Sequence, residues 1–132
     1  MTAIEVTNLR KVYGSLVAVN DISFTVNEGE VFGILGPNGA GKTTTIECIE
    51  GLREPDGGEI RVLGQLRRGE ANGIKERIGI QLQTTGLYPL LTVSELLKLF
   101  GTFFSKSLPV DELVRLVSLE DKRNTRSKDL SG

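Results

Sequence analysis

Histidine and tryptophan are absent from the 132-residue sequence, and its single cysteine is Cys48. Without histidine, the chain has no imidazole metal ligand, no histidine-activated nucleophile and no histidine acid–base step. A lone cysteine cannot form an internal disulfide, which excludes a disulfide framework and favours a reducing compartment. We expect Cys48 to be a small buried residue rather than a reactive thiol.

Long apolar runs and an excess of charge are also missing. No stretch of about 18 apolar residues occurs, and the N-terminus lacks the pattern of a signal peptide. The 16 Lys and Arg residues nearly balance the 17 Asp and Glu residues, for a net charge of −1. This balance argues against a nucleic-acid partner. We therefore expect a cytoplasmic globular chain that reaches a membrane only through a partner.

Apolar periodicity predicts several strands. Apolar and polar residues alternate over residues 4–9 and 22–26, which indicates two half-buried antiparallel strands. Residues 31–35 are almost continuously apolar, as in a strand buried on both faces of a parallel sheet. Residues 59–63 and 78–82 predict two further strands.

Two regions carry helix signals. Residues 44–50 predict a short helix that Gly51 ends. Thr92 and Glu95 have the spacing of a capping box, and a broad apolar stripe that reaches Phe103 and Phe104 follows them. Pro109 opens a second amphipathic segment. Residues 92–118 are therefore expected to form a small helical subdomain.

A glycine-rich segment lies between the apolar run and the first predicted helix. It matches the phosphate-binding pattern G-x-x-x-x-G-K-[ST] with Gly36, Pro37, Asn38, Gly39, Ala40, Gly41, Lys42 and Thr43. Glycines let successive backbone N–H groups surround a phosphate, and the helix N-terminus adds positive potential. Lys42 can reach the β- and γ-oxygens, and the Thr43 hydroxyl can bind Mg²⁺. The alternative is a glycine-rich turn without a ligand.

The segments around this loop resemble the ATPase domain of ATP-binding cassette (ABC) transporters from end to end. Residues 9–14 resemble its first strand with an adenine-stacking aromatic, and residues 36–44 its Walker A loop. Residues 77–83 are similar to the strand that leads into the Q-loop, and residues 130–132 to the opening of the LSGGQ signature. The resemblance also covers residues 20–24, which are similar to the next strand, and the spacing of Gly51, Leu52 and Pro55.

The resemblance implies roles for residues around the nucleotide. Tyr13 would stack on adenine, Ala18 would line the same face, and Thr44 would extend the phosphate loop. Gln83 would reach Mg²⁺ and the attacking water through its amide oxygen, with Gln81 as the competing candidate. By the same resemblance, Lys42 and Gln83 are the catalytic residues.

The signature residues imply contacts between subunits. Ser131 and Gly132 resemble residues that grip the γ-phosphate bound to the opposite subunit of a head-to-tail dimer. A transmembrane permease subunit is the other partner that the family implies, and it would hold the chain at the inner or plasma membrane. The pattern looks slightly more like exporter-type bacterial ATPases than importers.

The resemblance also implies the architecture. It predicts an α/β, P-loop NTPase-type partial sheet with an N-terminal antiparallel β subdomain and a small helical subdomain. Residues 1–83 would form the β and P-loop core, and residues 84–132 the Q-loop and the helical subdomain.

Some residues that the family uses for hydrolysis have no counterpart in the sequence. The Walker B aspartate, its neighbouring catalytic glutamate and the switch histidine follow the signature in the family. We therefore expect this chain to bind Mg-ATP as the ATP-binding part of a transporter, with little hydrolysis by itself. The alternatives are a catalytically inactive nucleotide-binding or assembly module and another P-loop enzyme such as a GTPase, although the base-reading Asn-Lys-x-Asp of a GTPase is missing.

Overall fold

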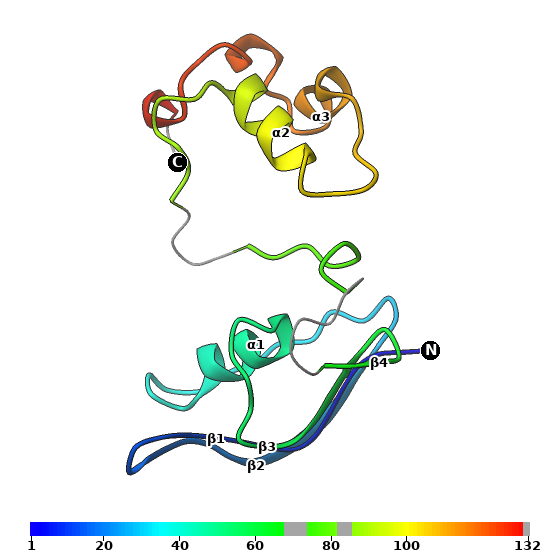
Figure 1. The fold of residues 1–132 in the computed structure, drawn as a ribbon, viewed down its shortest axis with the longest axis vertical. Helices are drawn as coiled ribbons and strands as arrows, with labels where there is room; N and C mark the ends of the chain where they lie inside the picture. The colour runs from blue at the N-terminus through cyan, green and yellow to red at the C-terminus, as the bar shows by residue number, and fades with distance from the viewer. Residues whose placement is uncertain (68–73, 82–85, 131–132) are drawn as a thin grey trace. The chain divides into compact units, whose positions relative to one another are not determined.

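The computed structural model describes residues 1–67, 74–81 and 86–130 (Figure 1). The chain separates into two compact units, Met1–Ile80 and Gln81–Gly132. The predicted domain boundary at residue 83 lies outside the described residues. In the described part of the chain, no helix is long and apolar enough to cross a membrane.

The first unit is built on an antiparallel sheet. Its strands lie in the order β2-β1-β3-β4. They are β1 (Thr2–Tyr13), β2 (Leu16–Asn27), β3 (Gly57–Val62) and β4 (Gln65–Leu66). The strands predicted over residues 4–9, 22–26 and 59–63 are therefore present.

The register of β1 and β2 pairs apolar residues of the two strands. Val6 pairs with Phe24, and Leu9 pairs with Ile22. Val6 and Leu9 are buried, and each lies in the hydrophobic core of the unit. Val6 and Leu9 are three positions apart, so strict alternation would put them on opposite faces of the sheet. A register shift between them, where Asn8 has a φ of +50°, allows both side chains to reach the covered face.

Helix α1 (Lys42–Glu50) covers one face of this sheet (Figure 1). It begins slightly before the predicted residue 44 and ends at the predicted Gly51, whose φ of 76° is left-handed. Cys48 is fully buried between helix and sheet, as predicted. The buried core consists of Val6, Leu9, Val19, Cys48, Ile60, Val62 and Ile74.

Two predicted strands are not formed. Residues 31–35 have no regular secondary structure, and Val31 and Leu35 are 100% and 94% exposed. Residues 78–81 are also irregular, and Leu82 lies outside the described residues. A strand buried in a parallel sheet needs hydrogen-bonded neighbours. Within the described ranges the sheet contains only antiparallel pairs of β1 to β4, so residues 31–35 have no such neighbour.

The second unit contains α2 (Val93–Gly101) and α3 (Val110–Leu116), with short 3₁₀ turns at Glu120–Lys122 and Ser127–Asp129. The predicted capping box is present at the start of α2. Thr92 Oγ1 accepts a hydrogen bond from Glu95 N, and Thr92 N donates to Glu95 Oε2 at 2.8 Å.

The apolar stripe of α2 is shorter than the sequence suggests. Val93 and Leu96 are buried, and Val114 of α3 is buried with them in the second unit. The helix ends at Gly101, so Phe103 and Phe104 lie in the turn beyond it and remain exposed. The apolar residues in the first turns of α2 therefore pack in the second unit, where α2 contacts α3.

Candidate functional site: the phosphate-binding loop

The candidate site is the exposed loop that leads into α1. Its N-cap residue, Gly41, has no side chain to accept a hydrogen bond, and the first turn of α1 contains no acidic residue. The first N–H groups of a helix have no partner within the helix. The N-terminus of α1 therefore presents unpaired donors and a positive dipole end, which together suit an anion.

Gly41 is the position in the loop that tolerates no side chain. Its φ is +82°, and an added Cβ would lie 2.3 Å from the carbonyl oxygen of Ala18 and 3.1 Å from Val19 Cγ2. The backbone of β2 therefore lies directly against the loop. Ala18, which was expected to line the nucleotide site, is a neighbour of the loop through this carbonyl group.

Lys42 is held at the loop by its own backbone. The Nζ atom donates to the carbonyl oxygens of Gly36 and Pro37, each at 2.6 Å. An ammonium group has three donors. These two bonds keep the charge at the loop and leave one donor for a ligand oxygen.

The remaining loop residues are arranged around this turn. Asn38, Gly39 and Ala40 are exposed, and Ala40 N donates to Pro37 O at 3.2 Å. Thr43 is exposed and Thr44 is half-buried at the start of α1. The loop therefore opens outward, as a phosphate cradle requires.

The Thr43 hydroxyl is the group that could hold Mg²⁺. Mg²⁺ is usually bound by few protein oxygens together with phosphate oxygens and water. Over the described ranges, no group of three or more histidine, cysteine or acidic residues gathers to hold a metal. An exposed hydroxyl beside a free helix N-terminus fits a metal that arrives with its phosphates.

Tyr13 lies at the end of β1 and is 39% exposed. Two cationic side chains lie over its ring. Lys11 Nζ is 5.6 Å from the ring centroid, and Arg53 Cζ is 5.4 Å from it. Arg53 in turn forms an ion pair with Glu47 of α1. The ring is therefore linked through these side chains to the helix that follows the phosphate loop.

The other predicted site residues belong to the second unit. Gln83, Ser131 and Gly132 lie outside the described residues. Gln81, the competing candidate, is exposed in a segment without regular secondary structure.

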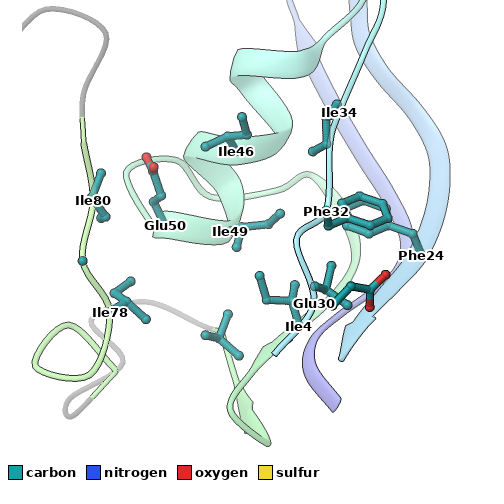
Figure 2. Close-up of a pocket in the computed structure, with 13 residues that line it drawn as sticks. Ile4, Phe24, Glu30, Phe32, Ile34, Ile46, Ile49, Glu50, Ile78 and Ile80 are labelled. Carbon is teal, nitrogen blue, oxygen red and sulfur yellow. The ribbon is translucent and has the colours of Figure 1, made fainter. Parts of the chain in front are cut away.

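An apolar pocket of about 450 Å³ also opens in the first unit (Figure 2). Phe24 and Phe32 stack in its wall with ring centroids 5.1 Å apart, and Ile46 and Ile49 of α1 face them. Burial raises the pKa of Glu50, which lies at its margin. Residues 36–43 do not line this pocket, so it is separate from the phosphate loop.

No motif or periodicity in the sequence indicated that Arg53 would contact Tyr13. Glu47 and Arg53 do not have the i,i+3 or i,i+4 spacing of side chains that meet on a helix, and Arg53 lies beyond the end of α1. The left-handed turn at Gly51 folds the chain back, so that Leu52 N and Arg53 N both donate to Glu47 O, at 2.9 and 3.1 Å. This helix end then allows the side chains of Glu47 and Arg53 to pair.

Arg67 is a second residue whose role the sequence did not indicate. It is only 4% exposed, and its Nη2 atom donates to Glu50 O at 3.0 Å, at the C-terminal end of α1. A Cβ on Gly51 would collide with this guanidinium group. The C-terminal end of α1 is therefore fixed by a buried cation, which is favourable beside the negative end of a helix.

A loop with the pattern G-x-x-x-x-G-K-[ST] that opens a helix with an uncapped N-terminus is typical of α/β proteins with a phosphate-binding loop. Comparison with known families gives the same class. The ABC transporter family model matches residues 19–132. The chain belongs to the ABC transporter family of ATP-binding domains.

Similar proteins cover nearly the whole chain. It is 42% identical over 135 residues to the Nod factor export ATP-binding protein I of Rhizobium leguminosarum bv. viciae, covering 98% of this chain and 43% of the relative. The protein of the same name from Cupriavidus pinatubonensis is 41% identical, with 100% and 42% covered. The chain thus spans less than half the length of these curated relatives.

Solved structures confirm the α/β, P-loop NTPase-type fold. An ATP-binding subunit of an ABC transporter matches with a TM-score of 0.81 and 32% identity, over 98% of this chain and 56% of that one. A dimeric ATP-binding cassette in a post-hydrolysis state with ADP and Pi matches with the same TM-score and 26% identity, over 97% and 63%.

Proposed function

We propose that this chain binds Mg-ATP as part of an ABC transporter subunit and couples nucleotide binding to transport through a membrane partner. The observation that carries this proposal is the N-terminus of α1. Its N-cap Gly41 makes no side-chain hydrogen bond, its first turn has no acidic residue, and Lys42 is held beside it by two loop carbonyl groups. A triphosphate supplies the negative charge and the acceptors that this arrangement lacks.

Each part of the nucleotide has a group suited to it. The loop N–H groups and Lys42 bind the phosphates, and the Thr43 hydroxyl becomes a ligand of Mg²⁺. Tyr13 stacks on adenine with the part of its ring that is exposed. The metal neutralises phosphate charge when it is bound, while the protein groups fix where the triphosphate lies.

Gln83 and the signature residues complete the proposed cycle. Gln83 contacts Mg²⁺ and the attacking water, and Ser131 and Gly132 contact the γ-phosphate held by a second ATP-binding domain. The dimeric solved structure that matches this chain supports a paired arrangement.

The proposed setting is the cytoplasmic face of the inner or plasma membrane. A transmembrane permease subunit would hold the chain there. The names of the similar proteins describe export, and export is the direction of transport that we propose.

Substitution of Lys42 tests the proposal. Calorimetric titration with Mg-ATP should show affinity about 30–150-fold weaker for Lys42→Ala, because a close ammonium contact contributes about 2–3 kcal/mol at intermediate dielectric. Lys98→Ala, which removes a lysine from α2 in the second unit, should bind as the unmodified chain does. Equal affinity of Lys42→Ala and the unmodified chain would contradict the assignment of the loop.

A further inference from the structure

Tyr13 carries more organised contacts than an aromatic residue at a strand end requires. Lys11 Nζ and Arg53 Cζ lie 5.6 and 5.4 Å from its ring centroid. Both are within the distance of about 6 Å at which a cation is attracted to an aromatic ring. Tyr13 as a whole residue is nevertheless 39% exposed, so a ligand can still reach it.

Each of the two cations is fixed by a carboxylate. Lys11 Nζ pairs with Asp56 Oδ1 at 3.2 Å, and Asp56 Oδ2 accepts from Val12 N at 2.7 Å. Arg53 pairs with the carboxylate of Glu47 and also donates from its backbone N–H to Glu47 O at 3.1 Å. The positions of both cations are therefore set by contacts other than the ring.

The Arg53 contact connects the ring with the phosphate loop. Glu47 lies in α1, whose first residue is Lys42. Tyr13 belongs to β1, and one path from its ring to the loop passes from Arg53 to Glu47 and along one helix. A rigid helix between the two groups keeps the spacing between a base platform and a phosphate site constant.

We infer that Arg53 is a positioning residue, which holds the Tyr13 ring at a fixed place relative to the phosphate loop for a nucleotide base. This inference rests on the proposed binding of ATP. A platform that is already immobilised loses less side-chain freedom when the base stacks on it. Arg53 should thus strengthen binding of a base-bearing triphosphate and leave a triphosphate without a base unaffected.

The test compares Arg53→Leu with Arg61→Leu. The side chains of Arg53 and Arg61 are 44% and 45% exposed, and Arg61 pairs with Glu59 on β3. The two variants therefore remove equal charge from equally exposed positions. Calorimetry measures the affinity of each for Mg-ATP and for inorganic triphosphate, and thermal unfolding followed by circular dichroism shows that each is folded.

A spectroscopic measurement reports on the ring itself. The sequence has no tryptophan and contains two tyrosines, so Tyr88→Phe leaves Tyr13 as the sole source of tyrosine fluorescence. In this background, adding Mg-ATP should quench the fluorescence when the base stacks on Tyr13. Arg53→Leu should shift the quenching curve to higher ATP concentration, and Arg53→Lys should restore part of the shift because it keeps the cation.

The expected result is a loss of ATP affinity of about threefold to tenfold for Arg53→Leu, with inorganic triphosphate binding unchanged. Arg61→Leu should alter neither. Equal ATP affinities of the two variants would overturn the inference, as would equal losses for ATP and triphosphate, which would indicate attraction by net charge. In either case the proposed function still holds if Lys42→Ala binds Mg-ATP more weakly than the unmodified chain. Failure of the unmodified chain to bind ATP would overturn both.

Discussion

The contact between Gly41 and β2 gives a stability prediction that can be worked out from the structure. A Cβ at Gly41 would lie 2.3 Å from the Ala18 carbonyl oxygen, which is backbone and cannot rotate away. Gly41→Ala therefore forces the loop and β2 apart. Gly39 provides a matched control, since its φ of +83° is almost the same as the +82° of Gly41 and an added Cβ there would meet nothing within 4 Å.

Both substitutions put alanine in a left-handed backbone conformation, and Gly41→Ala alone of the two also creates a collision with β2. Left-handed backbone costs alanine about 1–2 kcal/mol. Part of this is offset, by about 0.4–1 kcal/mol, because alanine restricts the unfolded chain. Gly39→Ala should thus lower the free energy of unfolding by about 0–1.6 kcal/mol. Gly41→Ala adds the cost of backbone displacement, about 1–3 kcal/mol, for a total of about 1–4.6 kcal/mol.

Urea unfolding followed by far-ultraviolet circular dichroism measures both values. The difference between the variants isolates the contact of the loop with Ala18, since the backbone strain is common to them. Equal free energies of unfolding for Gly41→Ala and Gly39→Ala would refute the close approach of β2 to the loop.

Four further predictions concern Tyr13, the capping box of α2 and Cys48. Tyr13→Ala should weaken Mg-ATP binding and leave inorganic triphosphate binding unchanged in calorimetry; equal losses would exclude stacking. Thr92→Ala should lower the stability of the second unit by about 0.5–2 kcal/mol in urea, the usual cost of a lost helix cap. The backbone N–H of Thr92 donates to the Glu95 carboxylate and lowers the pKa of Glu95 below its ordinary 4.5. The stability that this charge adds to the fold is therefore present above pH 4.5 and lost as the pH falls through the lowered pKa. The melting temperature of the unmodified chain should fall over that pH range, and the melting temperature of Glu95→Gln should fall less. Burial raises the pKa of Cys48, so a thiol reagent at pH 8 should label it slowly in the folded chain and quickly in denaturant, and rapid labelling of folded protein would contradict its burial.

Local patterns explain why much of the structure could be predicted. The pairing of β1 with β2 follows from alternating apolar residues, and the start of α2 follows from the spacing of Thr92 and Glu95. The phosphate loop was predictable because glycine, lysine and threonine positions define its chemistry within a short segment. Each of these signals is contained in neighbouring residues.

The structure differs from the sequence prediction where a local conformation depends on contacts with residues far away in the sequence. Residues 31–35 have the composition of a buried strand, but forming one requires neighbouring strands that the described residues do not provide. The contact of Arg53 with Tyr13 depends on the left-handed turn at Gly51, which redirects the chain after α1. Apolar periodicity in the sequence indicates neither the missing neighbouring strands nor the direction of the chain after Gly51.

The central claim is that the backbone N–H groups at the start of α1 bind a triphosphate. Amide chemical shifts of the isotopically labelled chain, recorded while Mg-ATP is added, test it most directly. The account predicts that the largest changes fall on the amides of residues 36–44, and that inorganic triphosphate reproduces them. Changes confined to the apolar pocket around Ile46 and Ile49, with residues 36–44 unmoved, would contradict it.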